Sequence, residues 1–223
     1  MTQIRFGIFN YLINEENHEA VLGRFNNTKV YDNSANKNAF NNTALTSFDV
    51  IIPPTIYYNY SYYFVRRIGV CAFRFSMITS LRVGKFVEEI QYRSVDWCTY
   101  LKKIEFDRES ALTKIDNSFA VNATITEIAI PSGVTVITQY IFDHVVKLKK
   151  VYYGGSGIEC NSNLNTSSIL NIYVLPNFKN HTFCNHSVTI LSEFPDEKPR
   201  SRNNDYKCFQ PISYSYLLVF ILI

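Results

Sequence analysis

The feature of this sequence that most restricts its fold is an apolar pattern that recurs at a nearly fixed interval. Three apolar residues spaced as apolar-x-x-apolar-x-apolar occur six times. The first interval is 33 residues, and the following intervals are 23, 24, 23 and 21 residues. Five successive matches at such regular spacing indicate a structural repeat. The six triplets are Leu45/Phe48/Val50, Ile78/Leu81/Val83, Leu101/Ile104/Phe106, Ile125/Ile128/Ile130, Leu148/Val151/Tyr153 and Ile169/Ile172/Val174.

A second apolar segment, ending in a bulky residue, repeats in phase between these triplets. Its members are Val65/Ile68/Phe73, Val87/Ile90/Val95 with Cys98, Leu112/Ile115/Phe119 and Val134/Ile137/Phe142. Phe119 lies one residue early in its unit, which suggests a local deletion. The triplet has the spacing of the L-x-x-L-x-L core of a leucine-rich repeat. We therefore expect a repeat solenoid of short parallel β-strands joined by turns and short helical segments.

Strand geometry predicts which side chains form an exposed strand face. Because alternate side chains point in opposite directions, Leu81 and Val83 should point inward and Arg82 outward. Equivalent residues of stacked strands should form columns, and such a face is where repeat proteins usually bind ligands. One expected column is Asp49, Arg82, Glu105, Ala129, Tyr152 and Tyr173, and a flanking column is Ser47, Ser80, Lys103, Glu127, Lys150 and Asn171. The candidate binding residues from these columns are Arg82, Glu105, Tyr152, Tyr173, Lys103, Glu127 and Lys150.

Composition agrees with a folded domain and excludes several classes of protein. The chain has 223 residues, 47% of them apolar and 18% charged, with 17 Phe and 16 Tyr. These values exclude a disordered chain and a collagen. A net charge of +3 is too small to indicate a nucleic-acid partner. The polar surface is expected to consist of Asn, Ser, Thr and Tyr more than of charges.

Several segments resemble one repeat family. Residues 128–134 (IAIPSGV), 134–153 and 65–73 (VRRIGVCAF) are similar to BspA-like leucine-rich repeats, the 23-residue units of bacterial and protist surface antigens. The similarity covers about residues 45–190, and it departs from the family at Val95 and Ala120, where Phe is usual. The resemblance implies a non-enzymatic solenoid, often adhesive and at the cell surface.

The expected organisation has five parts. Residues 1–44 form an N-terminal cap with an Asn-rich loop, and Asn14–Arg24 could be a helix, because Asn14 can cap it and two Glu follow. Residues 45–174 form the repeat array and 175–194 close it. A polar linker follows at 195–212, and an apolar tail at 213–223. The tail has about half the length that crosses a bilayer as a helix, so it is a marginal anchor, a truncated span or a last strand under the core.

Two further features are candidates for binding. The insertion Tyr57–Phe64 contains Tyr57, Tyr58 and Tyr60; it is either a binding loop or a slipped repeat whose aromatic rings pack on neighbouring turns. The pairs Lys102-Lys103 and Lys149-Lys150 occupy equivalent repeat positions. They form either a basic stripe for an anionic partner or solvated turns.

The cysteines and histidines predict no catalytic or metal chemistry. The five Cys are scattered and do not predict a disulfide framework, and Cys98 is expected to be a buried, inert thiol. His181, Cys184 and His186 could ligate zinc with Cys160 as a fourth ligand, but a closing turn is the preferred interpretation. We expect no catalytic residues, no metal and no cofactor.

These expectations lead to two hypotheses about the function of the protein. The leading hypothesis is a surface antigen or adhesin that binds a protein or glycan through its strand face. The alternative is an intracellular scaffold for protein–protein interaction, because the N-terminus predicts no signal peptide. Seven N-x-S/T sequons favour a secreted or surface protein, so the location is left open, as is membrane association. The sequons begin at Asn26, Asn41, Asn59, Asn122, Asn165, Asn180 and Asn185.

Overall fold

The computed structural model describes residues 1–6, 9–23, 48–161, 164 and 170–195. In this part of the chain all regular elements are strands, so the expected short helical segments are wrong here. The strands are β1 (Thr2–Phe6), β2 (Phe9–Asn14), β3 (Glu19–Leu22), β4 (Phe48–Ile51), β5 (Thr55–Tyr58), β6 (Ser61–Ile68), β7 (Ile78–Val83), β8 (Glu89–Ile90), β9 (Lys103–Phe106), β10 (Lys114–Ile115), β11 (Glu127–Ile130), β12 (Val136–Ile137), β13 (Lys150–Tyr153), β14 (Glu159–Cys160), β15 (Asn171–Val174), β16 (Thr182–Phe183) and β17 (His186–Ile190).

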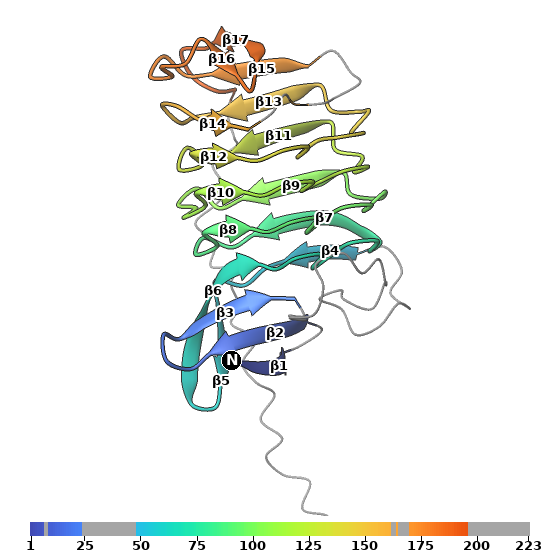
Figure 1. Ribbon diagram of the computed structural model, residues 1–223, viewed down its shortest axis with the longest axis vertical. Helices are drawn as coiled ribbons and strands as arrows, with labels where there is room; N and C mark the ends of the chain where they lie inside the picture. The colour runs from blue at the N-terminus through green and yellow to red at the C-terminus, as the bar shows by residue number, and fades with distance from the viewer. Residues whose placement is uncertain (7–8, 24–47, 162–163, 165–169, 196–223) are drawn as a thin grey trace, which may run out of the picture.

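The repeats stack as rungs, and each rung contributes a longer and a shorter strand (Figure 1). The longer strands pair in parallel in the orders β4-β7-β9 and β11-β13-β15, and β17 extends the second group. We call these longer strands (β4, β7, β9, β11, β13 and β15) the strand face. The shorter strands β8, β10, β12 and β14 form a second parallel ladder that continues from β6. The expected parallel strand pairing is confirmed.

The apolar residues that recur at regular intervals in the sequence fill one continuous core between these ladders. Leu81 and Val83 are fully buried, as expected, and Ile128, Val151 and Ile172 are at most 2% exposed. Each strand alone buries only one face, so burial requires the neighbouring rungs. The short strands add Ile68, Ile90, Ile115 and Ile137 to the same cluster.

A third side of each rung has no strand but has a repeating backbone. We call it the turn face; it comprises residues 71–75, 93–97, 118–122 and 140–144. In each rung the first and last of these residues have a positive φ of 53 to 60°, and none of them is glycine. Backbone hydrogen bonds still join adjacent rungs here, such as Phe73 N to Ser94 O (2.7 Å) and Val95 N to Phe119 O (3.1 Å). These left-handed residues exclude a helical segment, because they interrupt its right-handed backbone.

The N-terminal strands end the stack on one side (Figure 1). The antiparallel strands β1, β2 and β3 join the short-strand ladder through parallel pairing of β3 with β6. The predicted helix over Asn14–Arg24 is wrong: β2 ends at Asn14 and β3 occupies Glu19–Leu22. The Asn14 side chain does accept a hydrogen bond from Glu16 N (3.0 Å), as an N-cap would, but His18 has φ 53° and the chain reverses into a hairpin.

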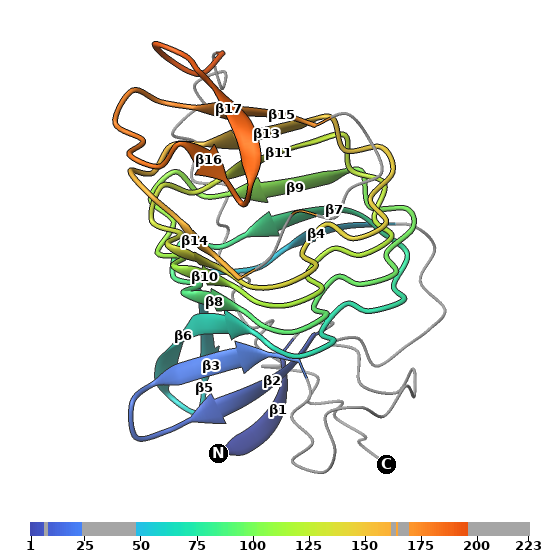
Figure 2. The same cartoon turned by 45° about the horizontal axis from the view of Figure 1, so that its top comes forward.

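At the opposite end, β16 and β17 form an antiparallel pair over the last rung (Figure 2). A disulfide joins Cys160 in β14 to Cys184 after β16, with Cα atoms 5.2 Å apart. The scattered cysteines predicted no disulfide framework, and they did not predict this single bond. No helix in the described residues is long and apolar enough to cross a membrane. The predicted Asn-rich loop at 25–44, the linker at 195–212 except Pro195, and the apolar tail lie outside the described residues.

Candidate functional site

The strand face brings most of the predicted column residues side by side. Arg82 pairs with Glu105, Ser80 with Lys103, Glu127 with Lys150, and Tyr152 with Tyr173. Such in-register parallel pairing places equivalent side chains about 4.8 Å apart.

The lower end of the predicted column is wrong at one position. Asp49 lies opposite Ser80 and Ile51 lies opposite Arg82, so the pairing of β4 with β7 is displaced by two residues from the predicted alignment. The column therefore begins with an apolar side chain that is 51% exposed. Asp49 instead accepts hydrogen bonds from Ser80 Oγ (2.6 Å) and Thr79 Oγ1 (2.7 Å), which lower its pKa.

The middle of the strand face carries a cluster of opposite charges. Lys103 Nζ lies 2.7 Å from Glu105 Oε1, and Arg82 Nε lies 3.9 Å from Glu105 Oε2. Farther along, Glu127 and Lys150 are both exposed and lie in register. The predicted basic stripe is interrupted by this alternation, because Glu127 occupies the rung between Lys103 and Lys150. Lys102 and Lys149 are exposed at their turns.

The far end of the strand face carries an aromatic cluster. The rings of Tyr152 and Tyr173 stack, with centroids 5.1 Å apart and planes 20° apart. Phe194 meets the Tyr152 ring edge-on at 5.5 Å. Both tyrosines are half-buried, so the cluster offers a firm apolar surface beside the charged part of the same face.

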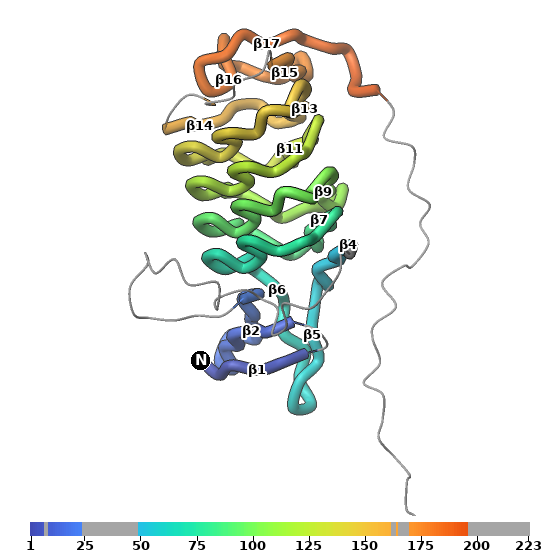
Figure 3. The backbone as a smooth tube through the Cα atoms, turned by 90° about the vertical axis from the view of Figure 1, so that its right-hand side faces the viewer, coloured from blue at the N-terminus to red at the C-terminus, as the bar shows by residue number. Residues whose placement is uncertain are grey.

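The tyrosine-rich insertion is a β-hairpin that projects from the N-terminal end of the stack (Figure 3). Its turn residues Asn59 and Tyr60 have positive φ, and Tyr60 is 91% exposed. Tyr57 and Tyr58 are about one-third exposed, and Tyr57 packs on Tyr62 at 4.8 Å. The slipped-repeat interpretation is partly correct, because Phe64 packs edge-on against Phe86 of a neighbouring turn at 5.0 Å.

The histidine and cysteine cluster is organised by the disulfide. Cys184 is bonded to Cys160, so neither thiol can serve as a thiolate ligand. In the described residues no three His, Cys, Asp or Glu side chains are placed to hold a metal ion. Cys98 is fully buried and donates to Phe73 O at 3.0 Å, and burial raises its pKa to about 12. It is therefore the inert thiol that was expected.

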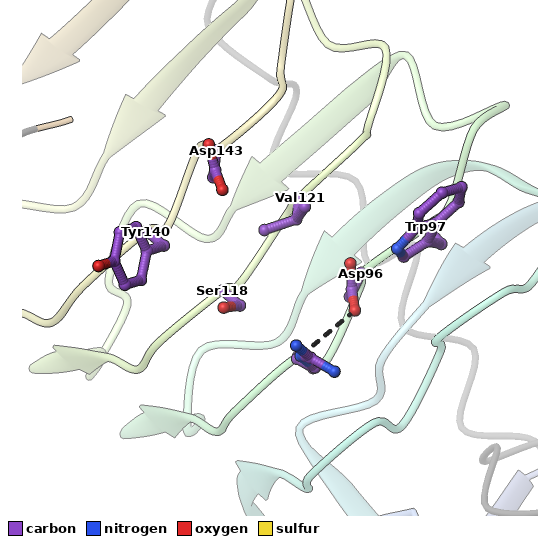
Figure 4. A pocket seen from close by; sticks show the side chains of 7 residues that line it. Asp96, Trp97, Ser118, Val121, Tyr140 and Asp143 are labelled. Atoms are coloured by element: carbon purple, nitrogen blue, oxygen red, sulfur yellow. Dashed lines mark ion pairs between the residues drawn. The ribbon is translucent and has the colours of Figure 1, made fainter. Parts of the chain in front are cut away.

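The turn face carries a groove that the sequence did not reveal. It has a volume of about 210 Å³ and is lined by residues of three successive rungs. Figure 4 shows Tyr140 and Trp97 at opposite ends, with Ser118, Val121 and Asp96 between them. Trp97 and Tyr140 are 47% and 45% exposed. The available signal was the spacing of 22 residues between Phe75 and Trp97, which places both rings on adjacent rungs, 5.9 Å apart.

A buried carboxylate lies at the base of this groove. Asp96 is 2% exposed, and Arg74 Nε donates to its Oδ2 at 3.0 Å while Arg93 Nε lies 3.6 Å from the same oxygen. Asp96 Oδ1 has no hydrogen-bond partner, and neither has Arg93 Nε. Burial outweighs the two guanidinium groups and raises the pKa of Asp96.

Comparison of the sequence and the fold with known proteins finds a matching family model and similar structures. Residues 33–171 match the model of the BspA type leucine rich repeat region in six copies. The pneumococcal vaccine antigen PcpA superposes with a TM-score of 0.57 at 18% identity, over 79% of this chain and 50% of that one. A T. pallidum leucine-rich repeat protein gives 0.56 at 15% identity, over 78% and 71%. These likenesses show the fold. A search of curated proteins found no match.

Proposed function

The chain belongs to the family of BspA-type leucine-rich repeat proteins, and from this premise we propose that it is a non-catalytic binding module. In this proposal the repeats form a solenoid whose strand face binds a macromolecular ligand. The observation that carries the proposal is the stacked pair Tyr152–Tyr173, held by Phe194 beside exposed charges. Aromatic anchors next to a polar rim are typical of protein interfaces.

Between the two ligand classes expected from the sequence, the strand face favours a protein over a glycan. Its charges alternate along the columns, from Arg82 and Glu105 to Glu127 and Lys150. Alternating charges fix register against a complementary protein surface and disfavour partners with one sign of charge. The tyrosine hairpin around Tyr60 is a second contact region of this proposed interface, because exposed tyrosines supply contact area with few rotatable bonds.

We further propose that the module works outside the reducing cytosol, as a surface antigen or adhesin. The Cys160–Cys184 disulfide supports this location, because such bonds persist mainly in oxidising compartments. Three sequon asparagines, Asn59, Asn180 and Asn185, are exposed. Labelling of intact cells with a membrane-impermeant reagent should modify the protein. Labelling only after lysis would favour the intracellular scaffold instead.

A photo-crosslinking amino acid at position 173 of the full chain tests the binding face. In the cell that makes the protein, we expect a discrete adduct from position 173. The control is position 100, where a tyrosine that is 50% exposed, and so more accessible than Tyr173, lies outside the strand columns. Equal adducts from both positions, or none from position 173, would contradict the proposal. An adduct that a glycosidase dissolves would identify a glycan ligand.

A further inference from the structure

The groove on the turn face contains one donor and one acceptor that lack partners. Asp96 Oδ1 and Arg93 Nε are both buried without a hydrogen bond, although their side chains form an ion pair through Asp96 Oδ2. Asp96 Oδ2 lies 3.6 Å from Arg93 Nε, whereas Oδ1 is the oxygen without a partner. A buried polar atom without a partner costs about 1–3 kcal/mol, and a bound ligand could recover that cost.

The pair restricts the chemistry of the ligand. An ammonium group has only donors and would leave Arg93 Nε unpaired. A carboxylate or a dianionic phosphate ester has only acceptors and would leave Asp96 Oδ1 unpaired. A hydroxyl group both donates and accepts, so adjacent hydroxyl groups on one molecule can satisfy both atoms.

The charge balance of the groove favours the same class of ligand. Arg74 and Arg93 are offset by Asp96 and Asp143, so the groove carries little net charge to attract an ion. Salt-bridged charges of this kind serve as directed hydrogen-bonding groups for a neutral ligand.

The ends of the groove add apolar contacts. Trp97 is supported by Phe75 at 5.9 Å, and nearly half of its side chain is exposed at one end. Tyr140 occupies the other end, and Ser118 contributes a hydroxyl group between them. A sugar ring offers hydroxyl groups around its edge and C–H groups on its faces, which matches polar groups at the base and aromatic rings at the ends.

We propose that this groove is a second ligand site, separate from the strand face, that binds one sugar residue of a glycan. Asp96 accepts from and Arg93 donates to its hydroxyl groups, while Trp97 and Tyr140 contact the ring. The left-handed residues of the turn face position these side chains, because Arg93, Trp97, Ser118 and Tyr140 all have positive φ.

Trp97 is the single tryptophan of the chain, so intrinsic tryptophan fluorescence reports on this groove alone. The full, disulfide-bonded protein is titrated with a panel of methyl glycosides and short oligosaccharides. We expect a saturable change in Trp97 emission with at least one sugar. Tyr140→Ala should weaken that sugar about fivefold, because one aromatic contact is lost. Asp96→Asn should weaken it too, and Tyr140→Ala keeps the test valid if Asp96→Asn does not fold.

Controls separate this site from the strand face and from other ligand chemistries. Tyr100→Ala and Tyr173→Ala should leave the sugar titration unchanged, since neither residue lines the groove. Acetate and methylammonium should give no saturable change, because each would leave one of the two buried atoms unpaired. The peptide analogue N-acetylglycine methylamide, whose amides both donate and accept, should give none because it has no sugar ring face to contact Trp97 and Tyr140. A flat response to every sugar, an equal loss in Tyr100→Ala, or saturation by one of these three probes would overturn the proposal. Failure here leaves the strand-face result at position 173 unaffected.

Discussion

Along the strand face, neighbouring rungs pair as parallel β-strands within the groups β4-β7-β9 and β11-β13-β15, whereas along the turn face they are joined by hydrogen bonds between turns with left-handed residues. Both faces enclose one core. The strand face presents columns of like-positioned side chains, such as Tyr152 beside Tyr173. The turn face presents a groove, because its two left-handed residues per rung redirect the chain. One repeat can therefore display a paired strand surface on one side and a groove on another around the same apolar core.

The largest effect is expected from the core residues behind each face. Phe142→Ala, behind the turn face, should lower the free energy of unfolding by about 3–5 kcal/mol, because a fully buried ring is lost. Ile128→Ala, behind the strand face, should lower it by about 2–5 kcal/mol. Denaturant unfolding measures both, with Val146→Ala as an exposed control. A value for Phe142→Ala near that of Val146→Ala would show that the turn face does not share the core.

The disulfide should stabilise the C-terminal strands β15 and β17 more than the turn face. Cys160→Ala with Cys184→Ala should lower the free energy of unfolding by about 3 kcal/mol, because the unfolded chain loses a cross-link over 24 residues. Hydrogen exchange should then rise first in β15 and β17. A uniform rise over residues 71–144 as well would contradict this local role.

Glycine substitutions should have opposite signs on the two faces. His144→Gly should raise the free energy of unfolding by about 1 kcal/mol, because φ 56° is unfavourable for a residue with a Cβ atom. Glu127→Gly, exposed in β11, should lower it by about 1 kcal/mol, because glycine weakens a strand. Thermal unfolding of both variants checks the signs. If both substitutions changed the free energy of unfolding in the same direction, the two faces would not differ in backbone conformation as described.

The smallest effect concerns two aspartates with opposite pKa shifts. The pKa of Asp49 lies below 3.8 in the fold, so its contribution to stability is present above pH 3.8 and is lost as pH falls through the lowered value. The pKa of Asp96 lies above 3.8, so stability falls as pH rises from 3.8 through the raised value. Unfolding of Asp49→Asn and Asp96→Asn, each compared with the parent protein at a series of acidic pH values, should give opposite slopes. Parallel slopes would contradict the assignment.

The sequence predicted the strand face because its signal is local and periodic. Leu81 and Val83 point inward and Arg82 outward, as alternation requires. Asp49 departed from its column because β4 pairs with β7 two residues away from the alignment of their apolar triplets. Asn14 formed the hydrogen bond of an N-cap, but strand pairing of β2 with β3 determined the structure.

The turn face was harder to predict because its residue types do not indicate a left-handed backbone conformation. Non-glycine residues such as Arg93 and Tyr140 adopt positive φ only because the stacked rungs hold them there. The Cys160–Cys184 bond did have a signal, since its separation of 24 residues is one repeat and places both thiols in adjacent rungs. The groove around Asp96 required three rungs together, which no single segment shows.

In the proposed function the strand face, and not the turn face, binds the protein partner. The direct test is the affinity of the purified partner identified at position 173 for two variants. Tyr152→Ala with Tyr173→Ala should weaken binding about thirtyfold, as expected for an anchor worth about 2 kcal/mol. Trp97→Ala should leave the affinity unchanged. Full affinity in the tyrosine variant, with loss in Trp97→Ala, would contradict the account.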